Sequence, residues 1–232
     1  MTITEQPTRT NFEIVALDLY RDIHKGIRSE LFGVTLDAGR LDPGVRARRV
    51  DLAGRIRSAV DLLASHAEHE DRAVQPAIEL HLPAYAETIA TDHVAIEARM
   101  DTLVAMADEA VEAVDAYAAI HRLYLELASF TANYLEHQDF EERVVMPALD
   151  LAIGVPAVAE IHGAIIGSIP PDEMAHSLAL MLPAMNVDNR AELLGGMKAN
   201  APAEVFEGVW GLAASVLSEA DHRAVATRLG IA

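Results

Sequence analysis

Hydrophobic residues recur every three or four positions over the first two thirds of the chain, as expected for residues that share one face of an α-helix. Short stretches containing glycine or proline interrupt this pattern and mark helix ends. The pattern predicts four long helices, with expected ranges of about 12–35, 45–81, 84–110 and 115–145. Residues 1–10 precede the first helix and are expected to form a disordered lead-in.

Six polar residues of types that bind metals interrupt the apolar faces of these predicted helices. They are His24, His66, Glu70, His93, His137 and Glu141. In two places a histidine precedes a glutamate by four positions, which puts both side chains on one helical face about one turn apart. A proline follows each glutamate by six positions, at Pro76 and Pro147. Each pair can therefore present an imidazole and a carboxylate to the same point in space.

The same residues form an internal repeat. His24 and His93 are 69 positions apart, and the two His-x-x-x-Glu pairs are 71 positions apart. Each half therefore predicts a helical hairpin with a lone histidine on its first helix and a pair on its second. Two such hairpins predict an all-α fold, an antiparallel up-down-up-down four-helix bundle over residues 1–155. The pseudo-symmetry predicts that all six side chains meet near the centre of the bundle.

A single histidine–glutamate pair at this spacing is most often a solvated ion pair on a helix surface. Here both pairs lie on apolar faces, where burying an unpaired charge is costly. Both also recur in register with another histidine on the preceding helix. Four imidazoles and two carboxylates can be buried together when cations lie among them, so the pattern predicts a site for more than one metal ion.

The chain has 232 residues, of which 36 are acidic and 18 basic, for a net charge of −18. Such a surface repels nucleic acids and anionic membranes, so neither is an expected partner. Cysteine is absent, which excludes disulfides and thiolate metal sites. The first residues lack the apolar core of a signal peptide, and no apolar run approaches the roughly 18 residues of a membrane span. We therefore expect a cytoplasmic protein.

The character of the sequence changes at Pro156, after which we expect a separate helical extension over 156–232. A glycine- and proline-containing stretch at 162–171 is expected to be a linker. Four short helices are predicted beyond it, at about 172–185, 188–198, 203–217 and 219–229. The extension has a weaker repeat of its own and contains no His-x-x-x-Glu pair, so it is not expected to complete the metal site.

The order H…HxxxE…H…HxxxE over residues 12–150 resembles that of the hemerythrin-like, His-His-Glu cation-binding family. The resemblance implies a non-haem di-iron centre, with Glu70 and Glu141 bridging two iron ions and the four histidines capping them. Six protein ligands would leave positions for an oxo or hydroxo bridge and for an exogenous ligand. Manganese and zinc also suit imidazole and carboxylate donors. A ferritin-like site would instead use Glu-x-x-His on two helices beside lone glutamates.

Three further residues could reach the centre. Glu97 stands where oxygen-carrying hemerythrins have an additional histidine, and it could be a ligand, interact with one, or face solvent. Tyr20 and Tyr134 lie four and three positions before His24 and His137. Each could donate a hydrogen bond, react with an oxidant, or simply pack as a core aromatic. The fourth helix also has HxxxE where the carriers have HxxxxD, so reversible oxygen carriage is not expected.

The resemblance implies a protein that binds or reacts with small oxidants (peroxide, oxygen or nitric oxide) in oxidative or nitrosative stress. As an enzyme it would be a di-iron oxidoreductase that consumes peroxide or nitric oxide. The alternative is a non-enzymatic module that senses or binds oxygen, nitric oxide or iron and signals through the C-terminal helices. Iron storage is the weakest of these readings, because a closed bundle with two sites holds little metal.

Overall fold

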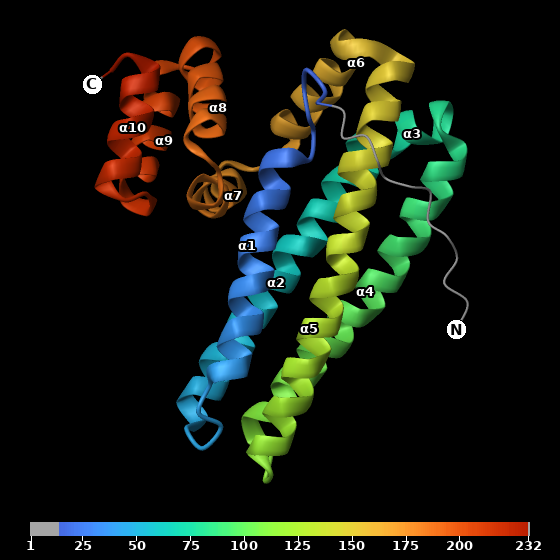
Figure 1. Ribbon diagram of the computed structural model, residues 1–232, viewed down its shortest axis with the longest axis vertical. Helices are drawn as coiled ribbons and strands as arrows, with labels where there is room; N and C mark the ends of the chain where they lie inside the picture. The colour runs from blue at the N-terminus through green and yellow to red at the C-terminus, as the bar shows by residue number, and fades with distance from the viewer. Residues whose placement is uncertain (1–13, 232) are drawn as a thin grey trace. The chain divides into compact units, whose positions relative to one another are not determined.

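The computed structural model describes residues 14–231, and this part of the chain is helical and contains no strand (Figure 1). The helices are α1 (Arg21–Arg40), α2 (Arg46–Ala73), α3 (Gln75–His81), α4 (Pro83–Glu112), α5 (Ala116–Phe140), the π-helix η1 (Glu141–Val145), α6 (Met146–Ser168), α7 (Pro171–Ala184), α8 (Val187–Asn200), α9 (Ala203–Val216) and α10 (Glu219–Leu229). The all-α prediction is confirmed. The expected lead-in, residues 1–10, lies outside the described residues.

The chain divides into two compact units. The first comprises the residues up to Tyr20 together with Val34–Ser168, and the second comprises Arg21–Gly33 together with Ile169–Ala232. Helix α1 is therefore divided between the units. Residues Arg21–Gly33 belong to the second unit, and the rest of the helix, to Arg40, belongs to the first. This division differs from the predicted boundary at residue 155, because α6 continues through Pro156 as far as Ser168.

The first unit is a helical bundle in which α4 packs against both α2 and α5 (Figure 1). The end of α1 packs against α5. The hydroxyl of Thr35 lies 3.1 Å from that of Thr131, and Gly39 lies so near Tyr124 that a Cβ there would come within 3.0 Å of the ring. A side chain at position 39 would therefore require the ring of Tyr124 to shift.

A hydrophobic core fills the end of this bundle where α2, α5 and α6 meet α3 and α4. Its buried members are Tyr20, Val74, Ile78, Ala86, Ile89, Val145, Met146, Leu149 and Val158. Glu141 lies in the same continuous helical run as Val145, Met146, Leu149 and Val158 and is itself buried. The buried Glu141 therefore directly precedes, along the chain, the core residues of η1 and α6.

The prolines that follow the two His-x-x-x-Glu pairs disturb their helices in different ways. A proline has no N–H to donate to the carbonyl four residues earlier. At Pro76 the predicted helix 45–81 is split into α2 and α3, and the intervening Val74 donates its N–H to the carbonyl of Glu70 at 2.8 Å. At Pro147 the chain instead widens into η1, which begins at Glu141. Single π-turns of this kind are frequent at functional sites.

Helix α1 begins at Arg21, later than the predicted start near residue 12. The carboxylate of Asp18 accepts a hydrogen bond from the N–H of Tyr20 at 3.0 Å. A side chain that bonds its own backbone two residues later stabilises a turn in place of a helix. The apolar spacing before Arg21 therefore reflects packing against the bundle core, since Val15, Leu17 and Leu19 lie against it.

Helix α6 bends at Gly154, whose φ of 78° lies in the left-handed region that glycine adopts without strain. The continuous run Ala116–Ser168 contains a window that is long and apolar enough to cross a membrane by length and composition. This differs from the expectation that no apolar run has that length. Core helices of proteins outside membranes meet the same criterion, so the composition carries no conclusion about a membrane.

The second unit contains the four short helices α7 to α10, each within two residues of its predicted range. Leu182, Leu194, Ala213 and Val225 form its buried core. The guanidinium of Arg190 is buried beside them, donates to the carbonyl of Leu182 at 2.7 Å and pairs with Asp221. The predicted linker at 162–171 is wrong, because most of it belongs to the end of α6.

Candidate metal centre

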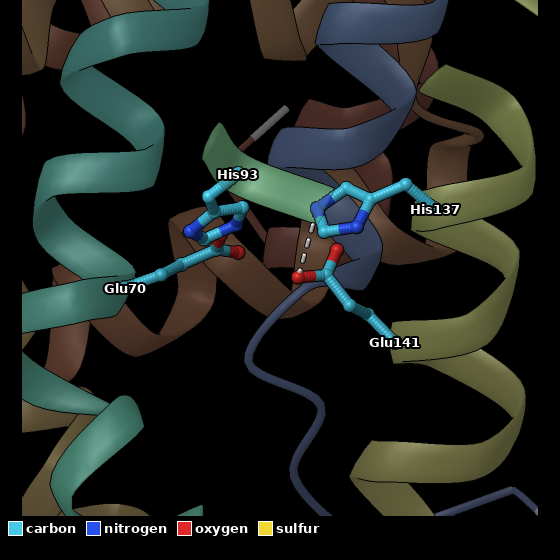
Figure 2. A group of neighbouring side chains, drawn as sticks. All are labelled: Glu70, His93, His137 and Glu141. Carbon is cyan, nitrogen blue, oxygen red and sulfur yellow. Dashed lines mark ion pairs between the residues drawn. The ribbon is translucent and has the colours of Figure 1, made fainter. Parts of the chain in front are cut away.

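Four side chains from four elements of the bundle converge on one point (Figure 2). They are Glu70 from α2, His93 from α4, His137 from α5 and Glu141 from η1. Each offers one nitrogen or oxygen atom, and these atoms all lie within 4.8 Å of one another. The structure therefore brings together four of the six residues that the sequence predicts as ligands.

The two histidines of this group face its two carboxylates through Nε2. His137 Nε2 lies 3.3 Å from Oε1 of Glu141, one turn along the same helical run. His93 Nε2 lies 3.8 Å from Oε2 of Glu70, which comes from the adjacent helix. The other oxygen of Glu70 lies 3.0 Å from Nε2 of His66. Glu70 therefore spans two imidazoles, one with each carboxylate oxygen, and His66 joins the site as a fifth predicted ligand.

These atoms fit a transition metal. Bonds from nitrogen or oxygen to such an ion are about 2.0–2.2 Å long, so two donors on opposite sides of it are about 4.2 Å apart. Neighbouring donors here are 3.0–3.8 Å apart, and no two ligand atoms of the group are more than 4.8 Å apart, so small shifts on either side of this value suffice. Glu70 and Glu141 are 7% and 1% exposed, and two carboxylates in so little solvent repel each other unless positive charge lies between them. Imidazole and carboxylate donors without thiolate suit iron, manganese or zinc.

The remaining ring nitrogens of the two histidines face aspartates. His93 Nδ1 lies 3.0 Å from Oδ1 of Asp71, and His137 Nδ1 lies 3.5 Å from Oδ2 of Asp92. Sequence analysis missed both aspartates, since neither lies on the apolar stripe of its helix. A signal was present, because each stands next to a predicted ligand in the sequence.

The charge state of His137 depends on these neighbours. Burial by itself lowers the pKa of an imidazole, but the contacts with Asp92 and Glu141 and the charges of Glu141 and Glu70 act in the other direction. Together they raise the pKa of His137 to about 10 in the absence of metal. The metal-free centre therefore holds a proton on His137 at neutral pH, which balances part of its negative charge.

Both tyrosines singled out in the sequence are buried and lie close enough to the centre to respond to its charges. Burial, followed by the negative charges of Glu141 and Glu70, raises the pKa of Tyr20 well above its usual value. The same causes raise the pKa of Tyr134, whose ring centroid is 5.8 Å from that of His137. Both residues therefore remain neutral phenols. Tyr20 is also part of the hydrophobic core, which agrees with the alternative that it packs as a core aromatic.

The last two predicted positions, His24 and Glu97, differ in their burial. His24 is completely buried on α1, in the part that belongs to the second unit, so its meeting with the other ligands stays a prediction. Glu97 is exposed on α4 and does not belong to the group around Glu70 and Glu141. Of the three roles open to Glu97, the structure supports that of a solvent-facing charge.

Comparison with family models matches residues 15–149 to the hemerythrin HHE cation binding domain. The match covers more than half of the chain and includes every predicted ligand. A comparison with curated proteins and one with solved structures each found no match.

Proposed function

Because the chain belongs to the hemerythrin HHE cation-binding family, we propose that its bundle holds a non-haem di-iron centre which binds or reacts with a small oxidant. Peroxide, oxygen and nitric oxide are the substrates that fit this proposal, and protection against oxidative or nitrosative stress is the corresponding role. A cytoplasmic location is part of the proposal and rests on the acidic, cysteine-free composition.

One observation carries the proposal. The two oxygens of Glu70 face imidazoles from different helices, at 3.0 Å from His66 and 3.8 Å from His93. A carboxylate placed in this way can bind two ions at once, one through each oxygen. Glu141, beside His137, supplies a second buried carboxylate at the same place. His24 would complete the set of six ligands.

When bound, the iron pair would supply Lewis acidity and reversible one-electron oxidation. The protein would supply the enclosure. The rings of His93 and His137 pack edge to face with centroids 5.0 Å apart, and the buried Tyr20 and Tyr134 lie near enough to the site to respond to the charges of its carboxylates. Because most of these side chains are buried, the proposal expects a very small molecule as the ligand. This size limit favours diatomic molecules and peroxide over organic substrates.

A second candidate function is that of a sensor. The observation that favours it is the continuity of α1, which carries His24 and belongs partly to each unit. A change in ligation at the centre could therefore be transmitted along one helix. In this version the protein binds oxygen, nitric oxide or iron without turnover and signals through α7 to α10.

The experiment is turnover by protein reconstituted anaerobically with ferrous iron. Consumption of peroxide and of nitric oxide would be followed for the wild type, for Glu141→Gln and for Glu97→Gln as the matched exposed control. The proposal expects turnover in the wild type and the control and its loss in Glu141→Gln. Absence of turnover, together with changed hydrogen exchange in α1 and α7 when nitric oxide is added, would favour the sensor.

A further inference from the structure

We propose that Asp71 and Asp92 are positioning residues of the metal centre, which orient the two central imidazoles through their Nδ1 atoms and so strengthen metal binding. The inference rests on the proposed metal-binding function of this site. It assigns a role to two residues that are not among the predicted ligands and do not belong to the group of converging ligand atoms.

The direction of the rings supports this role. In His93 and in His137, Nε2 faces a glutamate and Nδ1 faces an aspartate. An imidazole that binds metal through one nitrogen carries its proton on the other nitrogen and donates it to an acceptor. A carboxylate beside Nδ1 therefore selects the tautomer whose free electron pair on Nε2 points to the metal. It also makes that nitrogen a stronger donor to the metal.

Each aspartate belongs to a different helix from the ring that it contacts. Asp71 follows Glu70 on α2 and contacts His93 on α4, while Asp92 precedes His93 on α4 and contacts His137 on α5. Successive residues of a helix point about 100° apart. For this reason position 92 can face α5 while position 93 faces α2. The hydrogen-bonded contact of Asp71 with His93 connects α2 to α4, and the 3.5 Å contact of Asp92 with His137 connects α4 to α5.

The exposure of Asp71 and Asp92 indicates that they can orient the two rings without being needed for the fold. The side chains of Asp71 and Asp92 are 58% and 42% exposed, whereas those of His93 and His137 are 12% and 5% exposed. An acceptor at the solvent edge keeps much of its hydration, so it can hold a buried ring without itself being buried. Its removal leaves no cavity in the core. The metal-free fold should therefore survive the loss of either carboxylate.

The test measures the affinity of full-length protein for Zn²⁺ and Co²⁺ by competition with a chromophoric chelator. Asp71→Ala and Asp92→Ala are compared with Asp61→Ala and Asp101→Ala, which remove exposed aspartates from the same two helices without a histidine contact of this kind. We expect affinity to fall by about 10- to 100-fold in the first pair, as for other acceptors of metal-bound histidines. The control pair should bind like the wild type, and the melting temperature of all four metal-free variants should equal that of the wild type.

Asp71→Asn and Asp92→Asn provide a second, conservative test. The amide oxygen can still accept the Nδ1 proton but carries no charge, so affinity should lie between those of the wild type and the alanine variants. The Co²⁺ absorption bands should shift in every Asp71 and Asp92 variant and in neither control.

Equal affinities in the Asp71, Asp92 and control variants would overturn the inference. So would a fall in affinity that is accompanied by an equal fall in the stability of the metal-free protein, since the role would then be structural. A centre that shows the expected loss of affinity but does not react with oxidants would support the inference while overturning the proposed function. Wild-type protein that takes up no metal would overturn both.

Discussion

Glu70 on α2 and His93 on α4 face each other across adjacent helices, with 3.8 Å between Oε2 and Nε2. The other oxygen of the same carboxylate lies 3.0 Å from Nε2 of His66. If two ions bind as proposed, this shared position makes Glu70 the predicted ligand whose loss should affect both.

We expect two metal ions per chain in the wild type and loss of both in Glu70→Ala. His66→Ala should retain the ion held by His93, His137 and Glu141, since these three ligands remain together. Metal analysis of fully loaded protein after gel filtration measures the stoichiometry, with Glu97→Ala as the exposed control. Two ions retained by Glu70→Ala would show that its carboxylate does not bridge them.

Metal should also stabilise the fold, because an ion that binds only the native state adds free energy of unfolding. Free metal at 100 times its dissociation constant contributes about 2.7 kcal/mol per ion, which corresponds to roughly 5–11 °C in melting temperature for a chain of this size. The measurement is calorimetry of loaded protein before and after chelation, with metal content checked in each sample. An unchanged melting temperature after complete removal would place the metal at the periphery.

The stability of the metal-free protein should fall as pH rises from neutral to alkaline. The pKa of His137 is about 10 in the folded state, against 6.5 for an ordinary imidazole. The protonated ring therefore contributes its full stabilisation below about pH 6.5, and this contribution is lost as pH rises towards 10. The midpoints of urea unfolding at pH 6.5, 8 and 9.5 measure this loss of stability. His137→Gln should flatten this dependence, and an unaltered slope in that variant would contradict the assignment.

Reversible oxygen carriage is not expected. Glu97, which stands where the carriers have a further histidine, is exposed and does not enter the group of ligand atoms. In the proposed di-iron centre, the place of that histidine would then be open to solvent or oxidant. Protein reduced without oxygen, exposed to it and then returned to low oxygen pressure should not regain its original absorption spectrum. Glu97→Ala should behave in the same way, and repeated full reversal in the wild type would refute the expectation.

The end of α6 should matter for the bundle, although the sequence suggested that the first unit ends near residue 155. Val158 is fully buried, and Ile161 and Ile165 pack against the same core. Burying a valine side chain contributes about 1.5–3 kcal/mol, so a chain ending at 154 should be less stable than one ending at Ser168. Both should be assayed for melting temperature and bound metal. Equal melting temperatures of the two forms would mean that the second half of α6 does not stabilise the bundle.

Helix order and most ligand positions followed from spacing alone, because a period of 3.6 residues and a His-x-x-x-Glu repeat are local properties of the chain. The local irregularities did not follow. The same proline at the same distance produces a helix break after Glu70 and a π-turn at Glu141, so neighbouring contacts decide between the two. The late start of α1 accompanies a turn in which the Asp18 carboxylate accepts a hydrogen bond from the N–H of Tyr20.

The aspartates beside the histidines illustrate a second limit. Asp71 and Asp92 lie on the polar faces of their helices, where a carboxylate is usually only solvated. Their contacts with His93 and His137 join different helices, and a pattern along one helix holds no information on the rotation of its neighbour. The division of α1 between the two units is likewise a long-range property, which the spacing of its own residues does not specify.

That division has a consequence for synthesis on the ribosome. Arg21–Gly33 emerge early, but Gly26 packs against Leu180 and Met181, about 150 residues later in the chain. At about 5–20 residues per second, this segment waits roughly 8–30 s for its partners. Because contacts of such long sequence separation form late, the helices α2, α4 and α5 can associate while the segment that carries His24 is still without its docking helix. Assembly of this protein should therefore finish with its amino-terminal helix, in the reverse of the order in which the chain is made.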